Sequence, residues 1–277
     1  MININYIQKK YGFSFKSSLG QNFFNNDVML EEIVDALNIN KDDVILEIGP
    51  GFGVLTEKLL HRGKEVISVE VDKEAVFILK EEFKDRKNFY LINKDFLKMD
   101  LEEFKNLEGE IKVVANIPYY ITTPILEKLF KSNLNIDFIS FMVQKEVGDR
   151  ILASPSTKDY GSLTIFSNYF SNPKLIKKIP ACNFTPKPKV DSVFIKFEIK
   201  KEREFKDSHL EKEFLDFVKR CFSMRRKNLY NVLSQFKKSK EDLQKISEKL
   251  SVDFHKRAEN LNMDDFKNIF MEINKPN

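Results

Sequence analysis

Residues 116–119 read Asn-Ile-Pro-Tyr, residue types that can hold the exocyclic amine of a nucleobase. The Asn116 side-chain oxygen and the carbonyl of Ile117 or Pro118 can accept the two amine protons. The ring of Tyr119 can stack on the base. Acceptors placed in this way localise a lone pair that is otherwise delocalised into the ring, so that it can attack a carbon electrophile without a strong base. An ordinary Asn-x-Pro turn after a strand is the alternative interpretation.

A glycine-rich segment precedes this one by about 65 residues, where residues 47–53 read Glu-Ile-Gly-Pro-Gly-Phe-Gly. It follows the apolar run 44–46, which is typical of a buried strand, and precedes residues 55–60, which suit a helix. A strand, a tight turn and a helix N-terminus together form a nucleotide pocket. The order of the two segments suggests a loop for S-adenosylmethionine followed by an amine clamp, as in an adenine methyltransferase.

Gly49, Gly51 and Gly53 can take positive φ angles or let the backbone lie against a ligand, which side chains would prevent. A dinucleotide fingerprint would need glycine at position 54, where Val54 stands, so a nicotinamide cofactor is disfavoured. The spacing of these glycines alone also fits a structural turn that binds no ligand.

Two carboxylates follow later apolar runs. Glu70 comes directly after residues 66–69 and can accept hydrogen bonds from both hydroxyls of a ribose. Asp95 follows residues 89–92 and can accept from the adenine amine of the cofactor. Either acid taken singly also fits a solvated loop, but ligands in open α/β sheets bind at the carboxyl ends of the strands, which favours a site role for both.

These residues require an α/β fold with parallel strands. We predict a Rossmann-like S-adenosylmethionine-dependent methyltransferase domain over residues 1–199, with a seven-stranded mixed sheet. Residues 112–115 form the strand before the Asn-Ile-Pro-Tyr segment, and residues 175–176 and 193–199 form a terminal antiparallel hairpin. Residues 200–277 show apolar side chains at helical spacing and form a small helical domain.

Composition agrees with one large and one smaller domain, because 277 residues with 42% hydrophobic content can bury both. The sequence contains no apolar run long enough to cross a membrane and no signal-peptide pattern, so we expect a cytoplasmic protein without a membrane partner. Two cysteines are too few for a disulfide framework, and no Cys/His spacing suggests a metal site.

Basic charge is concentrated in the last part of the chain. Residues 1–199 carry 27 Lys and Arg against 28 Asp and Glu, whereas residues 200–277 carry 19 against 14. Arg225, Arg226 and Lys227 stand together there and could bind the phosphates of folded RNA. Charge runs also occur on helix faces that contact only solvent.

The whole chain resembles the rRNA adenine dimethyltransferases of the KsgA/RsmA type. Phe24 and Tyr120 depart from the family pattern, where Leu and Asn are frequent, which affects local shape and not the reaction. The segments that carry the resemblance are residues 19–24 (Leu-Gly-Gln-Asn-Phe-Phe), 47–56, 116–120, 144–150 (Gln-Lys-Glu-Val-Gly-Asp-Arg), 160–163, 184–192 (Phe-Thr-Pro-Lys-Pro-Lys-Val-Asp-Ser), 225–229 and 257–261.

The resemblance implies that two adjacent adenines near the 3′ end of small-subunit (16S) rRNA are each dimethylated at N6 during ribosome assembly. The substrate is then the rRNA of an immature small subunit, S-adenosylmethionine is the cofactor, and we expect the protein to act as a monomer. The resemblance also implies a cofactor site lined by Asn22, Phe24, Gly49, Glu70, Asp95 and Asn116.

Phe184 is a candidate for a second ring at the target base. The Phe-Thr-Pro-Lys-Pro segment could place it on the face of the base opposite Tyr119, which would recover part of the cost of unstacking that base. Pro186 and Pro188 stiffen the segment. With 26 Phe in the chain, a core position for Phe184 is the alternative.

Two other functions stay open. Large-subunit rRNA dimethyltransferases that confer macrolide resistance share the glycine and Asn-Ile-Pro-Tyr segments, although residues 144–150 and 257–261 favour the small-subunit type. The protein could also serve mainly as an assembly checkpoint that binds immature subunits, with methylation incidental.

Overall fold

The computed structural model describes residues 2–13, 22–236 and 238–275. The chain divides into two compact units. The first unit comprises Met1–Gly148 and Lys174–Ile199, and the second comprises Asp149–Pro173 and Lys200–Asn277. No helix in the described ranges has the length and apolar character needed to span a membrane.

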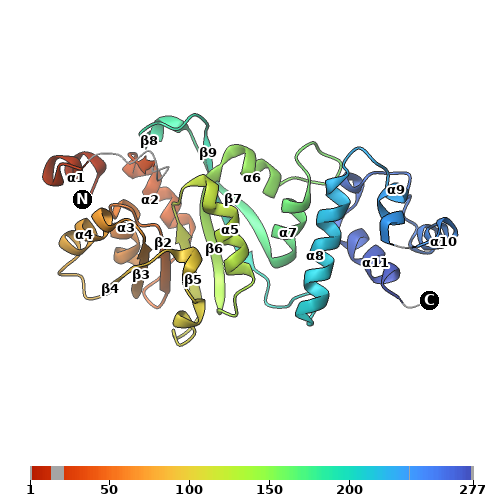
Figure 1. Ribbon diagram of the computed structural model, residues 1–277. Coiled ribbons are helices and arrows are strands. Elements are labelled where there is room, and N and C mark those ends of the chain that lie inside the picture. Colours follow the sequence, from red (N-terminus) through yellow and green to blue (C-terminus); the bar gives the residue numbers. More distant parts are fainter. Residues whose placement is uncertain (1, 14–21, 237, 276–277) are drawn as a thin grey trace. The chain divides into compact units, whose positions relative to one another are not determined.

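The first unit is built on a seven-stranded mixed sheet, which confirms the predicted fold class (Figure 1). Its strand order is β4-β3-β2-β5-β6-β9-β7. The five strands from β4 to β6 are parallel, and β9 runs antiparallel to β6. The strands are β2 (Val44–Ile48), β3 (Glu65–Glu70), β4 (Phe89–Asn93), β5 (Ile111–Ala115), β6 (Ile136–Gln144), β7 (Ser171–Ile179) and β9 (Ser192–Ile199).

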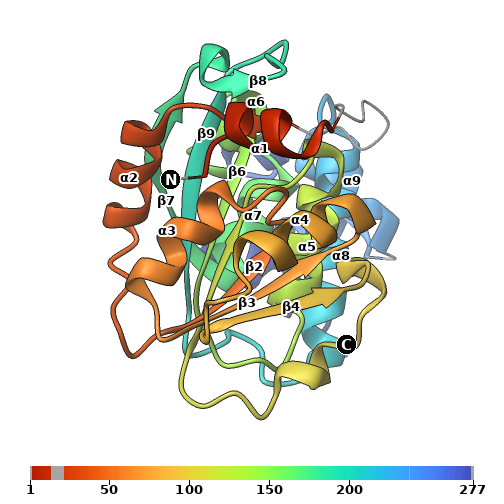
Figure 2. The ribbon, with the colours of Figure 1, turned by 90° about the vertical axis from the view of Figure 1, so that its left-hand side faces the viewer.

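Helices cover both faces of this sheet. Every residue of β2 and of β5 is buried, as expected for central parallel strands. Right-handed crossovers place α3 and α4 on one face and α5 on the other, because the strand order reverses direction between β2 and β5. Figure 2 shows α2, α3 and α4 in front of the strands. The helices are α1 (Ile4–Tyr11), α2 (Asp27–Ala36), α3 (Val54–Arg62), α4 (Lys73–Glu82), α5 (Tyr119–Phe130) and α6 (Lys145–Ile151).

The carboxyl ends of the parallel strands meet at one edge of the sheet. The register pairs Ile48 of β2 with Val69 of β3 and with Ala115 of β5. The turn after β2, the end of β3 and the segment after β5 therefore lie side by side. This edge is the topological switch point of the fold, where open α/β sheets bind ligands.

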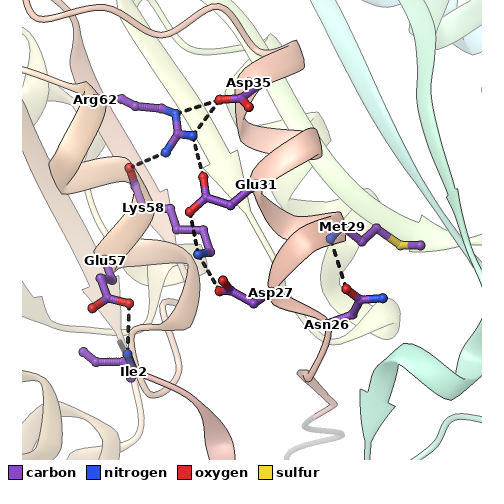
Figure 3. A network of polar contacts seen from close by, with 9 residues as sticks. All are labelled: Ile2, Asn26, Asp27, Met29, Glu31, Asp35, Glu57, Lys58 and Arg62. Atoms are coloured by element: carbon purple, nitrogen blue, oxygen red, sulfur yellow. Dashed lines mark hydrogen bonds and ion pairs between the residues drawn. The ribbon is translucent and has the colours of Figure 1, made fainter.

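A network of ion pairs fixes α2 against α3 (Figure 3). The Lys58 ammonium contacts Asp27 and Glu31, and the Arg62 guanidinium contacts Glu31 and Asp35. The Lys58 side chain is only 3% exposed, so its charge requires these partners. Because α2 directly follows Asn22 and the short strand β1 (Phe23–Phe24), the network also fixes the position of that segment.

The second unit is a helical bundle with an aromatic core. The ring of Phe214 packs against Tyr169, Phe205 and Phe270. The chain enters this unit for the last time after residue 199, at the predicted boundary. Residues 149–173 also belong to the unit, since Tyr169 is buried against Phe214 of α8. Its helices are α7 (Ser162–Phe170), α8 (Ser208–Ser223), α9 (Leu229–Leu233), α10 (Lys240–Leu250) and α11 (Met263–Ile273).

Candidate active site

A cavity of about 380 Å³ opens at the carboxyl edge of the sheet in the first unit. Its walls come from the turn after β2, the ends of β3 and β4, and the segment between β5 and α5. Residues 19–21 of the predicted N-terminal motif lie outside the described residues. The predicted site residues that line the cavity are Asn22, Gly49, Gly51, Glu70, Asp95, Asn116, Pro118 and Tyr119.

The glycine turn forms one wall of the cavity. Gly49, Gly51 and Gly53 have φ angles of +68°, +57° and +88°, a region that L side chains rarely adopt. A Cβ atom at Gly49 would lie 2.9 Å from Ile117 Cγ2, and one at Gly51 would lie 3.0 Å from a ring carbon of Phe23. Glycine is therefore required at both positions, by backbone conformation and by close packing.

Glu70 ends β3 with both carboxylate oxygens engaged. Oε1 accepts hydrogen bonds from the backbone N–H groups of Val71 and Asp72, each at 2.8 Å, and Oε2 accepts from Gly51 N at 3.1 Å. A carboxylate has about four lone-pair positions, so this arrangement leaves room for one further donor rather than two. Burial raises the pKa of Glu70, and the three backbone donors oppose this rise.

Glu47 lies fully buried beneath the same turn. Its Oε2 accepts hydrogen bonds from Thr56 Oγ1 at 2.8 Å and Ser68 Oγ at 2.7 Å. Its Oε1 has no hydrogen-bond partner among the residues that the structure describes. Burial raises the pKa of Glu47 to about 7, the two hydroxyl donors oppose the rise, and the negative charge of Glu70 adds to it.

Asp95 stands two residues beyond β4 and caps a short 3-10 helix, Phe96–Lys98. Its Oδ1 accepts from Leu97 N at 3.0 Å, and its Oδ2 lies 3.7 Å from the Lys98 ammonium. The Asp95 side chain is 40% exposed, so its carboxylate reaches both the cavity and solvent. This position allows it to accept a hydrogen bond from a ligand.

The segment after β5 brings three candidate groups to the cavity. Among the described residues, no hydrogen bond engages the Asn116 side chain, so its amide can meet a ligand. The Pro118 carbonyl accepts from Ile121 N at 3.2 Å at the start of α5 and keeps a second lone pair. The Tyr119 hydroxyl lies 2.7 Å from Ser192 Oγ, which fixes the ring. Burial raises the pKa of Tyr119, and the Ser192 hydrogen bond opposes this rise.

Phe24 and Phe184 do not line the cavity. The strands β1 and β8 (Phe184–Thr185) pair in register, with Phe24 opposite Phe184. Their rings meet edge to face with centroids 5.2 Å apart, and only 4% of Phe24 and 3% of Phe184 are exposed. Phe23 points the other way, as alternate residues of a strand do, and contributes its ring to the cavity wall.

Three exposed hydrophobic side chains at the cavity were not predicted as site residues. Val71, Leu97 and Tyr120 line it, and they are 56%, 36% and 68% exposed. Each lies one or two residues beyond a predicted polar or aromatic site residue. That proximity is the signal that could have identified them, because large apolar residues at a ligand pocket often remain exposed without a ligand.

The predicted basic cluster lies in the second unit, and its three residues make different contacts there. Arg225 Nη2 donates to the carbonyls of Lys158 and Tyr160, at 2.7 and 3.2 Å. Arg226 and Lys227 are exposed, and no side-chain partner engages them within the described ranges. Arg225 therefore ties two segments of the second unit together, and the other two residues present free positive charge.

Comparison with known proteins identifies the family of the chain. Residues 12–275 match the family model described as ribosomal RNA adenine dimethylase. The chain is 43% identical to a ribosomal RNA small subunit methyltransferase A of Clostridium botulinum, with 96% of each chain covered, and 42% identical to one of Clostridium acetobutylicum, with 98% of each covered.

Solved structures share the fold. A dimethyladenosine transferase from Plasmodium falciparum matches with a TM-score of 0.78 at 28% identity, covering 91% of this chain and 97% of that one. The 23S rRNA methyltransferase ErmE matches with a TM-score of 0.71 at 22% identity, covering 91% and 100%, which shows the fold alone. From the family match over nearly its full length, the chain belongs to the ribosomal RNA adenine dimethylase family.

Proposed function

We propose that this protein transfers methyl groups from S-adenosylmethionine to the N6 amines of two adjacent adenines near the 3′ end of small-subunit rRNA. The observation that carries the proposal is the cavity itself, which joins the glycine turn, Glu70 and the Asn116–Tyr119 segment at one sheet edge. Family membership and the names of the relatives support the choice of small-subunit over large-subunit rRNA.

The cavity residues fit S-adenosylmethionine. The glycine turn lines the cavity with backbone and no side chains at Gly49 and Gly51, and Glu70 keeps one lone-pair position for a ribose hydroxyl. Asp95 can accept from an adenine amine, and the exposed faces of Val71 and Leu97 can cover an adenine ring. When bound, this cofactor supplies an electrophilic methyl group.

The Asn116–Tyr119 segment would hold the target adenine. Asn116 Oδ1 and the free lone pair of the Pro118 carbonyl can accept the two N6 protons, which localises the nitrogen lone pair toward the methyl carbon. Tyr119 stacks on the base, and its hydrogen bond to Ser192 keeps the ring in one orientation. The proton released after transfer passes to water, so no His or Cys is needed.

We infer a division of labour along the chain. The sheet domain, predicted as residues 1–199, performs the chemistry, and the helical part, predicted as residues 200–277, holds rRNA through cationic side chains such as Arg226 and Lys227. The substrate would be an immature small subunit, and the protein would act on it as a monomer in the cytoplasm, where subunits assemble. The helical part carries five more basic than acidic residues, which supports this role.

Purified small subunits that lack the modification test the proposal. Incubation with labelled S-adenosylmethionine should place label on two adjacent adenines near the 3′ end, and large subunits should remain unlabelled. Label confined to large-subunit rRNA would contradict the proposed substrate. Absence of label on both subunits would contradict the proposed activity.

A further inference from the structure

Residues 186–191, here named the 186–191 loop, join the end of β8 to the start of β9, and both ends are tied to the cavity wall. At one end Thr185 pairs with Phe23, which lines the cavity, and Thr185 Oγ1 accepts from Asn25 Nδ2 at 2.8 Å. At the other end Ser192 Oγ lies 2.7 Å from the hydroxyl of Tyr119. The loop must therefore stand beside the cavity.

This loop presents two free positive charges. Its sequence is Pro-Lys-Pro-Lys-Val-Asp, and Lys187 and Lys189 are both exposed. Within the part of the chain that the structure describes, neither ammonium has an ion-pair or hydrogen-bond partner. The one acid of the loop, Asp191, forms no ion pair with either lysine among the described residues; its Oδ1 accepts from Ala181 N at 2.9 Å.

Some lysines of the first unit are paired with acids, whereas Lys84 and Lys87 are exposed and unpaired among the described residues. Lys58 contacts Asp27 and Glu31, and Lys112 contacts Asp43. Two unpaired cations beside a cavity that contains the carboxyl groups of Glu70 and Asp95 would reduce the repulsion that these acids exert on an RNA backbone. Pro186 and Pro188 restrict the loop, so less conformational entropy is lost when it binds.

We propose that Lys187 and Lys189 bind the RNA phosphates that flank the adenine held in the cavity. This inference rests on the proposed function, because it supposes that a single-stranded RNA segment enters there. Phosphate contacts carry no sequence information, but they fix the position of the strand. The helical part would then bind the subunit through its own cationic side chains, while the 186–191 loop holds the RNA strand at the cavity.

Replacing both lysines by alanine tests the proposal. Binding of unmethylated small subunits, measured over a salt series, should lose about 1.4 from the slope of log affinity against log salt, since each contact to a single strand contributes about 0.7. In methylation assays at moderate salt, KM for subunits should rise several-fold while kcat at saturating subunits stays unchanged. Arginine at both positions should restore the wild-type slope.

Lys84 and Lys87 provide a matched control. Both are exposed and unpaired among the described residues, and they precede β4, at the sheet edge opposite the cavity. Alanine at both should leave the slope unchanged. An equal loss in the control pair, or a wild-type slope in the loop variant, would overturn the proposal. Absence of methyl transfer by the wild-type protein would instead contradict the proposed function, because the salt slope is measured without the reaction.

Discussion

The Glu70 carboxylate accepts a hydrogen bond from the backbone N–H of Gly51 at 3.1 Å, which joins the end of β3 to the turn after β2. The same carboxylate holds the N–H groups of Val71 and Asp72. We therefore expect Glu70 to have two tasks, because it shapes the glycine turn and its remaining lone pair could accept from a ligand. A substitution at this position tests both.

Glu70→Ala should weaken S-adenosylmethionine binding by roughly 1–3 kcal/mol, the usual effect of losing a charged hydrogen-bonding partner. It should also lower thermal stability, since three backbone N–H groups lose their acceptor. Glu70→Gln keeps one acceptor oxygen, so its affinity for S-adenosylmethionine should lie between those of the wild type and Glu70→Ala. Titration calorimetry measures the effect, and wild-type affinity in a folded Glu70→Ala variant would exclude Glu70 as a cofactor ligand.

Glu47 predicts a specific pH dependence of stability. Its pKa is about 7 in the folded protein and near 4.5 when unfolded, so the folded state binds the extra proton between these values. The free energy that Glu47 contributes to folding is then fully present below about pH 4.5. It is lost as pH rises toward 7, by about 3 kcal/mol in total. Glu47→Gln should remove most of this fall.

Urea unfolding at pH 5 and pH 7.5 measures the change. The exposed acid Glu81, on the outer side of α4, is the control, and Glu81→Gln should keep the wild-type pH dependence. If Glu47→Gln shows the same loss of stability between the two pH values as the wild type, the buried carboxyl is not its source.

Substitutions at Phe184 distinguish a packing role of its ring from a role in binding the target base. As a core side chain packed on Phe24, it should cost about 3–5 kcal/mol of unfolding free energy when changed to Ala. Phe184→Leu should keep most of the stability and near-normal methyl transfer, whereas Tyr119→Ala should lose methyl transfer. A stable Phe184→Leu variant that fails to methylate would show that the Phe184 ring meets the target base during the reaction.

Substitutions in the basic cluster of the second unit should likewise distinguish a structural role from a role in RNA binding. Arg225→Ala removes the hydrogen bonds to the carbonyls of Lys158 and Tyr160 and should lower the melting temperature. Changing Arg226 and Lys227 together to Ala should leave the melting temperature unchanged and reduce the salt slope of subunit binding by about 1.4–1.8. An unchanged slope in this double variant would remove both residues from the RNA contact.

The sequence predicted the central strands because they are short apolar runs, followed by Gly49 after β2, ending at Glu70 in β3 and followed by Asn116 after β5. It also predicted the group of residues at the carboxyl edge, since parallel strands bring their ends together. The orientation of Phe184 could not be predicted, because β1 and β8 are two residues long and their pairing joins segments about 160 residues apart.

That residues 149–173 belong to the second unit could not be predicted from the sequence either. It depends on burial of Tyr169 beside Phe214, and no local pattern reports such a long-range contact. The structural role of Arg225 has the same origin, since its partners, the carbonyls of Lys158 and Tyr160 and the carboxylate of Glu259, lie far from it in the sequence. Local periodicity thus determined the elements, while the side chains that join distant segments required the structure.

The measurement that tests the central claim most directly compares the wild type with Asn116→Ala on unmethylated small subunits, with labelled S-adenosylmethionine and mapping of the modified nucleotides. The wild type should label two adjacent adenines near the 3′ end of the small-subunit rRNA. Asn116→Ala should bind subunits normally but transfer methyl groups on the order of a hundredfold more slowly, because its amide acts mainly in the transition state. An Asn116→Ala variant that labels the same adenines at the wild-type rate would contradict the amine clamp.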